Sequence, residues 1–524
     1  MTTPPPYDAE AAVLRLVPAP RGEAVRHEEP RGKRESQPPQ VEVLRHIGQN
    51  DFRYVRSSGD PYAVCLDGPA VAVPLRAKAH SGSGSLREHL MRTYLATFQR
   101  TPSQTALTDA VSALDALSYD APETDLWLRV APDPYADDVT WLDLGRPDGQ
   151  SVRIAPDGWT VTSPDPAEGP IWRRSKLIRP LPLPVRASGG WRAGMEAFAE
   201  ILPFTEATLP LAVAWVLAAL RPSLPRPIAY LTGEQGTGKS TSGKMLIGLL
   251  DGANAPLRQA PENLKDLGVT TAAGWTLALD NLSTMPGWLS DALCRVVTGD
   301  ALVSRALYSD DDVSVLSYQR PVLLTGIDVG AVRNDLAERM LPLELAPITR
   351  RRTTADLWGK YQQAHPEILG AVLDLAVAVW ADLPAASRDL AHRPRMADFA
   401  ELLHALDRVT GWQGLRTFYG TQDVLVDSVL EGQPVTAALR DWVDSASFPP
   451  DGWTGTMTDL NNALLNVSSS AQYGIREGWP RTPAALSARL KATAPALRAR
   501  GIHISPPTSN KNGRKYTITR VAPD

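Results

Sequence analysis

The sequence is poor in cysteine and contains no long apolar run. Its 524 residues include two cysteines, Cys65 and Cys294, which are too few for a disulfide-stabilised scaffold and fit a reducing compartment. The longest apolar runs, Leu209–Leu220 and Ala371–Trp380, fall short of the ~20 residues that span a bilayer, so we interpret them as buried helices. No signal-peptide pattern opens the chain. We therefore expect a cytoplasmic protein with no membrane partner.

Neither sign of charge dominates the chain. The formal net charge is -4, and hydrophobic and charged residues make up 43% and 21% of the sequence. This composition is that of an ordinary globular protein that can bury hydrophobic cores, and the length predicts about three to four domains. Because the chain as a whole is not a polycation, any nucleic-acid-binding surface must be local.

A glycine-rich loop stands between a predicted strand and a predicted helix. The apolar stretch Pro227–Leu231 precedes the loop, and apolar residues at helical spacing follow it. The loop has the complete G-x-x-x-x-G-K-S pattern, whose backbone N–H groups and following helix N-terminus bind phosphate. In this pattern Lys239 reaches the β- and γ-phosphates and Ser240 binds Mg²⁺. The predicted nucleotide-binding residues are Gly233, Glu234, Gln235, Gly236, Thr237, Gly238, Lys239, Ser240 and Thr241.

A second apolar run, Trp275–Asn281, ends in an acid. Buried parallel strands read as continuous apolar runs, and their carboxyl ends face the ligand in open α/β sheets. We therefore predict that Asp280 is the Walker B carboxylate and that Ser240 and Asp280 hold Mg²⁺. The alternative is an ordinary aspartate in a turn after the strand.

Three further strands are predicted downstream of Asp280. The segments Leu302–Leu307 and Val313–Tyr318 alternate as a hairpin, with its turn at Ser309–Asp312. The run Pro321–Thr325 is a buried strand that ends in a polar residue. Thr325 is thus positioned to orient the attacking water or to sense the γ-phosphate.

The order of these elements resembles the superfamily 3 helicase branch of AAA+ ATPases. The resemblance is closest to the ATPase half of phage- and plasmid-type primase–helicases of mobile elements, and it covers residues 190–350. The residues that carry it are Gly233–Thr241, Leu277–Asn281, Thr298–Tyr308, Val322–Thr325 and Asp335–Arg339.

This resemblance implies a hexameric ring with DNA in its central channel. The hairpin after Thr298 would project into the channel, so that Arg305 and Tyr308 would contact DNA. An arginine after the sensor strand would act on the nucleotide of a neighbouring subunit, with Arg339 the first choice and Arg333 the second. Each of these arginines could instead be an ordinary strand or salt-bridge residue.

Two residues depart from the family pattern. Asn281 stands where AAA+ enzymes usually carry a glutamate, and an amide cannot accept a proton as a general base. Thr325 stands where family members often have asparagine. The catalytic residues predicted with these departures are Lys239, Asp280, Asn281, Thr325, Arg339 and Arg333. The chain has no zinc-type cysteine cluster and no acidic primase motif, so a primase or initiator would be a separate partner.

The carboxyl-terminal segment is locally basic. No acid occurs between Glu477 and Asp524, and helices followed by two strands predict a winged helix-turn-helix. The recognition helix would be Pro483–Lys491, and the turn Ser509–Lys515 would form the wing. The predicted DNA-binding residues here are Arg489, Lys491, Lys511, Arg514 and Lys515. The alternative is a protein-binding winged helix with a solvated basic face.

The predicted fold class is α/β, with a parallel P-loop AAA+ core. In chain order we expect a disordered tail (1–40), an α+β domain of unknown role (41–185), the ATPase core (190–350), a helical lid (351–445) and a winged helix-turn-helix (450–524).

Three functions are compatible with this organisation. The first is an ATP- and Mg²⁺-dependent, helicase-like motor that acts as a ring on single-stranded or forked DNA during replication. The second is a nucleotide-switched DNA-binding assembly protein with little turnover, which Asn281 favours. The third is a P-loop ATPase whose winged helix binds protein instead of DNA.

Overall fold

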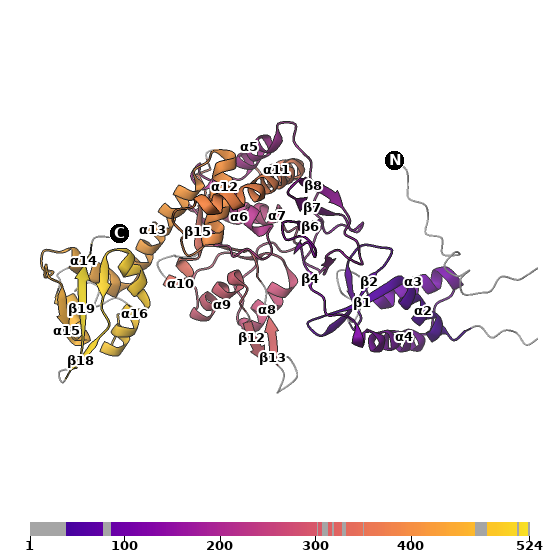
Figure 1. Cartoon of the computed structure of the whole chain (residues 1–524), viewed down its shortest axis with the longest axis horizontal. Helices are drawn as coiled ribbons and strands as arrows, with labels where there is room; N and C mark the ends of the chain where they lie inside the picture. Colours follow the sequence, from indigo (N-terminus) through magenta and orange to yellow (C-terminus); the bar gives the residue numbers. More distant parts are fainter. Residues whose placement is uncertain are drawn as a thin grey trace, which may run out of the picture. The chain divides into compact units, whose positions relative to one another are not determined.

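The structure, a computed structural model, falls into two units (Figure 1). Unit 1 comprises Met1–Ala155, Trp159–Leu183 and Gly252–Asn254, and unit 2 comprises Pro156–Gly158, Pro184–Asp251 and Ala255–Asp524. The residues that the structure describes are 38–76, 85–300, 302–305, 313–316, 319–326, 332–348, 351–466, 479–510 and 513–521. Almost the whole predicted tail, the hairpin turn at 309–312, Tyr308 and Lys511 lie outside them.

Three helices and a small sheet share the first core of unit 1. Leu44, Leu90 and Leu114 from the three helices are fully buried together with Phe52 from the sheet. The second helix begins at a capping box, in which Ser85 accepts the N–H of the residue three positions on. The elements are α2 (Gln40–Asp51), α3 (Leu86–Phe98), α4 (Gln104–Leu117) and the antiparallel strands β1 (Phe52–Ser57), β2 (Asp60–Cys65) and β3 (Ala72–Pro74).

Short strands follow between residues 126 and 172, so the α+β composition predicted for this region is confirmed. Four of them form one sheet, in the order β5-β6-β7-β8, and two shorter strands pair in parallel. The bounds are β4 (Leu126–Trp127), β5 (Val130–Pro132), β6 (Thr140–Asp143), β7 (Ser151–Ala155), β8 (Gly158–Thr162) and β9 (Ile171–Trp172).

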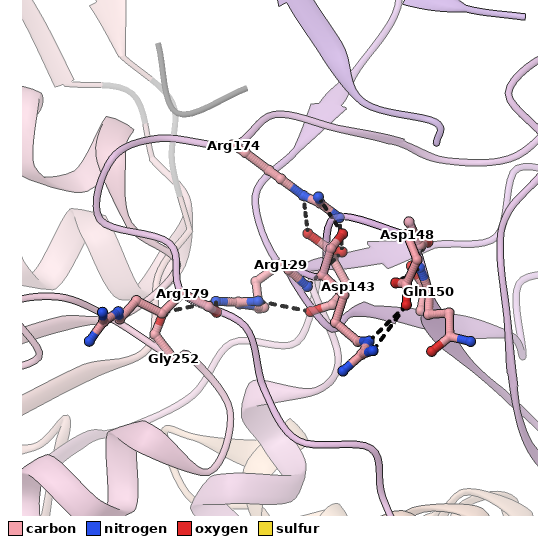
Figure 2. A network of polar contacts seen from close by, with 11 residues as sticks. Arg129, Asp143, Asp148, Gln150, Arg174, Arg179 and Gly252 are labelled. Atoms are coloured by element: carbon pink, nitrogen blue, oxygen red, sulfur yellow. Dashed lines mark hydrogen bonds and ion pairs between the residues drawn. The ribbon is translucent and has the colours of Figure 1, made fainter. Parts of the chain in front are cut away.

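A fully buried arginine organises the loops of unit 1 (Figure 2). Arg129 donates to the carbonyl oxygens of Asp143 at 3.0 Å, Arg179 at 2.8 Å and Gly252 at 3.0 Å. Beside it, the buried carboxylate of Asp143 forms an ion pair with Arg174 at 2.8 Å. A buried charge is costly unless its donors are satisfied, and here main-chain oxygens from three separate segments satisfy them. This network joins three segments of unit 1 around one buried guanidinium group.

The centre of unit 2 is a four-stranded sheet, and the predicted parallel arrangement of its strands is confirmed. The strand order is β11-β14-β10-β15, and all three pairings are parallel. The strand bounds are β10 (Ile228–Thr232), β11 (Leu277–Leu279), β14 (Val322–Thr325) and β15 (Met340–Glu344). The helices that follow or precede them are α7 (Lys239–Gly248), α8 (Leu264–Ala273), α9 (Gly287–Thr298) and α10 (Asn334–Ala337). The predicted hairpin is confirmed as β12 (Leu302–Arg305) and β13 (Val313–Leu316), which pair antiparallel.

Five helices complete this part of unit 2. The predicted buried helix Leu209–Leu220 is confirmed, because the ten residues from Pro210 to Ala219 are all buried. The apolar run Ala371–Trp380, which we also interpreted as a buried helix, is part of a much longer helix, which has 36 residues and contains Pro366 and Pro384. Its packing against neighbouring helices outweighs the helix-breaking tendency of proline. The helices are α5 (Gly190–Ile201), α6 (Leu209–Ala219), α11 (Thr354–Asp389), α12 (Ala397–Thr410) and α13 (Gly414–Gly432).

Among the described residues, α11 is the one helix whose length and composition would allow it to cross a membrane. Half of its most apolar window is buried inside the protein.

Residues 434–521 form what we call the C-terminal module, drawn in yellow tones in Figure 1. The helix predicted at Pro483–Lys491 is the first part of a longer helix, which continues through Pro495. The expected turn Ser509–Lys515 is wrong, because this segment is largely a strand pair, with Ser509 opposite Arg514. The elements are α14 (Pro434–Asp444), β16 (Trp453–Gly455), α15 (Met457–Asn466), α16 (Pro483–Ala499), β17 (Ile502–Ile504), β18 (Thr508–Asn510) and β19 (Gly513–Arg520).

Helix α13 contributes to two cores. Leu425 is buried in the core of the parallel sheet, and Leu430 is buried in the core of the C-terminal module. Between these two residues, Asp427 accepts a hydrogen bond from Arg500 of the module at 2.8 Å. The same helix is therefore part of both folding cores.

Helix α11 packs on α7 through two aromatic rings. Tyr361 donates its hydroxyl to the carbonyl oxygen of Met245 at 2.9 Å, and its ring lies 5.0 Å from that of His365. His365 is 8% exposed, and its ring bonds the backbone of Leu249 at one side while its Nε2 has no hydrogen-bond partner among the described residues. Burial lowers the pKa of His365 to about 4.

We expect His365 to make unit 2 less stable in mild acid. The unfolded imidazole takes up a proton near its ordinary pKa, whereas the folded one resists protonation down to about pH 4. Stability from this group is therefore full above that ordinary pKa and is lost as the pH falls toward 4. Between pH 7 and pH 5 the loss is about 2 kcal/mol.

Urea unfolding of the wild type and of His365→Phe at the two pH values measures this loss. The difference between pH 7 and pH 5 should be smaller in the variant by about that amount, because phenylalanine does not titrate. An equal difference in both proteins would contradict the prediction.

Candidate nucleotide-binding site

The glycine loop joins the end of β10 to the start of α7. Three of its residues have positive φ, namely Gly233 at 137°, Gly236 at 89° and Gly238 at 78°. Residues with a Cβ rarely adopt this backbone region, so the glycines of the motif are required here. Thr237 is buried inside the loop and donates its hydroxyl to the carbonyl oxygen of Glu234 at 2.9 Å.

The lysine and serine of the motif are the first two residues of α7. Lys239 is the first residue of α7, and its Nζ donates to the carbonyl oxygens of Gly233 at 2.9 Å and Glu234 at 3.0 Å. The ammonium group thus lies over the loop, at the helix N-terminus, where the partial positive charge of the helix also attracts anions.

Asp280 receives two hydroxyl groups from different elements. Its Oδ1 accepts from Ser240 at 2.9 Å and from Thr325 at 2.5 Å. Ser240 comes from α7, Asp280 follows β11, and Thr325 ends β14, so the carboxyl ends of neighbouring parallel strands bring them together. The sequence predicted Ser240 from the loop motif, and Asp280 and Thr325 from the ends of apolar strands. Oxygen ligands are those that Mg²⁺ prefers, and the Ser240–Asp280 pair has the chemistry to hold it.

Asn281 adopts an unusual backbone conformation. Its φ is +54°, a left-handed value that asparagine tolerates better than most residues with a side chain. Its N–H donates to the Thr325 hydroxyl at 2.9 Å, and a Cβ on Gly326 would lie 2.9 Å from its Cα. The side chain itself is exposed. The tight turn therefore accounts for asparagine here and disfavours glutamate.

A cleft of about 410 Å³ opens beside the loop. Its floor includes Gly236, Thr237 and Thr241, and it extends to residues that the sequence analysis did not single out. Ile348 and Arg351 come close to the loop, since a Cβ on Gly238 or on Gly236 would lie 3.5 Å and 3.7 Å from them. The missed lining residues include Glu200, Ile201, Pro203, Arg352 and Leu357. The basic run at 350–352 was the available signal for part of this wall, but its distance in sequence from the loop concealed the contact.

The residues present fit a nucleoside triphosphate with Mg²⁺. The loop offers an open glycine cradle, Lys239 and Arg351 supply positive charge beside it, and Ile201, Ile348 and Leu357 supply an apolar wall. Phosphates bind at a polar end of such a cleft, and a flat base packs against an apolar wall.

The two arginines predicted to act on a neighbour differ in exposure. Arg339 has a side chain 15% exposed, and it pairs with Asp335 at 2.6 Å. Asp335 also receives Arg395 at 2.5 Å. Arg333 is 59% exposed and pairs with Asp291 at 2.7 Å on the surface. Arg305 ends β12, but its side chain lies outside the described residues.

Two of the predicted DNA-binding residues line one groove of the C-terminal module. Lys491 of α16 and Arg514 of β19 stand on the walls of a groove of about 600 Å³. Its other lining residues are Thr456, Met457, Thr458, Pro483, Ala484, Ser487, Ala488 and Tyr516, none of which is acidic. Arg489 does not line this groove and is half-buried. Lys515 is half-buried near Asp459. Hydrogen bonds from Thr456, and to a smaller extent the charge of Lys515, hold the pKa of Asp459 below its usual value.

Two family models match most of unit 2. A model described as an actinomycete integrative conjugative element replication protein matches residues 196–428, and one described as the AICE RepA C-terminal domain matches residues 435–523. The two matches together cover more than half of the chain. The chain is a replication protein of a mobile element. Among curated proteins, the comparison found no match.

Solved structures resemble this replication protein only distantly. The C-terminal region of NrS-1 is 7% identical with a TM-score of 0.38, over 93% of this chain and 100% of that one. The JCV helicase is 14% identical with a TM-score of 0.24, over 45% and 64%. A full-length MCM homolog from Methanopyrus kandleri is 13% identical with a TM-score of 0.26, over 59% and 76%. Values this low add nothing to the assignment.

Thr325 should be needed to hold the turn of this replication protein's site together. Thr325→Val keeps the shape but leaves the Asn281 N–H without an acceptor and removes a donor from Asp280. We expect a loss of about 1–3 kcal/mol in the free energy of unfolding. Thr325→Ser keeps the hydroxyl and should stay close to wild type. Urea unfolding of the three proteins compares them, and a valine variant as stable as the serine variant would contradict the assignment.

Proposed function

We propose that this replication protein is an ATP-driven DNA motor of the helicase kind. The observation that carries the proposal is the meeting of Lys239, Ser240, Asp280 and Thr325 at the carboxyl edge of a parallel sheet, beneath a glycine loop. This arrangement is the one required for binding Mg·ATP and transferring its γ-phosphate to water. In this proposal the P-loop core has the AAA+ arrangement, with α11–α13 as a helical lid and the C-terminal module as a winged helix.

Each residue of the site has a distinct role in the proposal. The loop N–H groups and Lys239 bind the phosphates, while Ser240 and Asp280 hold Mg²⁺. Thr325 fixes the Asp280 carboxylate through the 2.5 Å hydrogen bond. Arg351, beside Gly236, adds positive charge from the same chain. Bound Mg·ATP supplies the phosphoryl group, and the chain supplies its position and its electrostatic surroundings.

A ring, with six subunits as the expected number, would complete the site from a neighbour. The residue offered to a neighbour has to be exposed, which favours Arg333 over Arg339 as the arginine that acts in trans. The hairpin β12–β13, with Arg305 and Tyr308, would contact single-stranded or forked DNA in the channel. A separate primase or initiator would act beside the ring in the cytoplasm.

The groove of the C-terminal module would contact the DNA backbone. Lys491 and Arg514 flank it, Thr456 and Ser487 add hydroxyl groups, and its lining contains no acid that would repel phosphate. These groups bind phosphate without reading sequence. The module would therefore hold the ring on DNA.

A second candidate function is a nucleotide-switched assembly protein with little turnover. The observation that favours it is the left-handed, exposed Asn281, which cannot accept a proton from water. In this case ATP would drive assembly on DNA and remain bound.

Hydrolysis of ATP separates the two candidates. We expect the wild type to hydrolyse ATP faster with single-stranded DNA, and Lys239→Ala to lose at least ~100-fold of that rate. Lys244→Ala, an exposed lysine on the same helix, should behave as wild type. A wild type that assembles with ATP but does not turn it over, together with a gain of turnover in Asn281→Glu, would contradict the motor and support the switch.

Binding to duplex DNA at several salt concentrations tests the groove. Each of Lys491→Ala and Arg514→Ala should weaken binding and reduce the slope of log K against log salt by about 1, the value for one phosphate contact. Arg498→Ala, an exposed arginine of α16 outside the groove, provides the matched control. An unchanged slope in both groove variants would remove the groove from the DNA-binding surface, and a protein-binding module would then be favoured.

A further inference from the structure

Glu200 is the one carboxylate among the residues that line the nucleotide cleft. It stands one residue before the end of α5, and its side chain is 61% exposed at the mouth of the cleft. Its neighbour Ile201 and the nearby Pro203 belong to the apolar part of the same cleft. A carboxylate at this position is unexpected, because it would repel phosphates.

Two cations hold this carboxylate in place. Oε1 accepts from Lys360 at 3.2 Å and from Arg352 at 3.3 Å. The hydrogen bond and charge of Lys360, followed by those of Arg352, keep the pKa of Glu200 below its usual range, so the group is ionised at neutral pH. Both contacts use the same oxygen, and Oε2 has no hydrogen-bond partner in the part of the chain that the structure describes. An oriented acceptor is therefore available at the mouth of the cleft.

The chemistry of a nucleotide limits what this acceptor can bind. In the proposed function the phosphates bind at the other part of the cleft, which Gly236, Thr237, Gly238 and Thr241 line and beside which Lys239 lies. Away from the phosphates, a nucleotide presents donors on the sugar, as hydroxyl groups, and on the base, as amino or imino groups. A flat base is best placed against the apolar side chains, whereas a solvent-exposed carboxylate suits the sugar. Carboxylates bind ribose hydroxyls in this way in other nucleotide-binding folds.

We propose that Glu200 selects ribonucleotides over deoxyribonucleotides by accepting a hydrogen bond from the ribose 2′-hydroxyl. Glu200 is a specificity-determining residue and takes no part in phosphoryl transfer. The proposal rests on the proposed nucleotide-binding function and adds the class of nucleotide that the site accepts. During DNA replication, the deoxyribonucleoside triphosphates used for synthesis would then not occupy the nucleotide cleft.

Equilibrium binding of Mg·ATP and Mg·2′-deoxyATP to the full chain tests the proposal. The wild type should bind ATP at least ~10-fold more tightly, the effect of one hydrogen bond to a charged group. Glu200→Ala should weaken the binding of ATP until the affinities for the two nucleotides agree within about 2-fold. The affinity for 2′-deoxyATP should stay unchanged. Glu200→Gln keeps a hydrogen-bond acceptor without the charge, so its preference for ATP should lie between those of the wild type and Glu200→Ala.

Two controls separate the sugar contact from a structural effect. Lys360→Ala removes the same ion pair from the other side but keeps the carboxylate, so it should preserve the preference for ATP. Glu196→Ala removes an exposed carboxylate of α5 that does not line the cleft, and it should preserve the preference as well.

The possible failures are distinct. Equal binding of ATP and 2′-deoxyATP by the wild type overturns the ribose contact while leaving the nucleotide-binding function intact. An equal loss of both nucleotides in Glu200→Ala, or an unchanged preference, also overturns it, because the carboxylate then reads the base or only positions Arg352. A wild type that binds neither nucleotide overturns the proposed function and this proposal with it.

Discussion

The candidate site depends on the hydrogen bonds that the carboxylate of Asp280 accepts. This carboxylate joins the hydroxyl of Ser240, from the helix after the glycine loop, to that of Thr325, at the end of a neighbouring strand. The hydroxyl of Thr325 also accepts the N–H of Asn281, so the two strand endings and the loop helix are tied at one point. Because the strands are parallel and buried, their ends lie at one edge of the sheet, where this single oxygen and its donors hold them together.

Charge is distributed in a way that supports one function without making the chain basic. Positive side chains gather beside the glycine loop and around the groove of the C-terminal module, while the formal net charge stays at -4. The buried Arg129 is a different case, since its guanidinium meets backbone oxygens and serves the packing of unit 1. Position relative to solvent thus separates arginines that are available to a ligand from those that serve packing, which composition alone cannot do.

The sequence predicted best where local rules and burial agree. The glycine loop and the strand endings at Asp280 and Thr325 follow from short patterns that each fix a backbone conformation. It failed where packing between distant segments decides: helix α11 passes through Pro366, and strand pairing replaces the turn expected at Ser509–Lys515. The far wall of the cleft, with Glu200 and Arg351, was missed for the same reason, because no local pattern in the sequence reports that these residues lie near the glycine loop.

Helix α13 bears on how such a protein can be rearranged in evolution. The two family matches end and begin at residues 428 and 435, which lie on either side of the last residues of this helix. Leu425 and Leu430, five positions apart in sequence, belong to different cores. A recombination event that exchanged the module at this boundary would have to supply both halves of one continuous helix, with matching faces. A new module could therefore pack only if its apolar residues continued the apolar face of α13 at the same helical spacing.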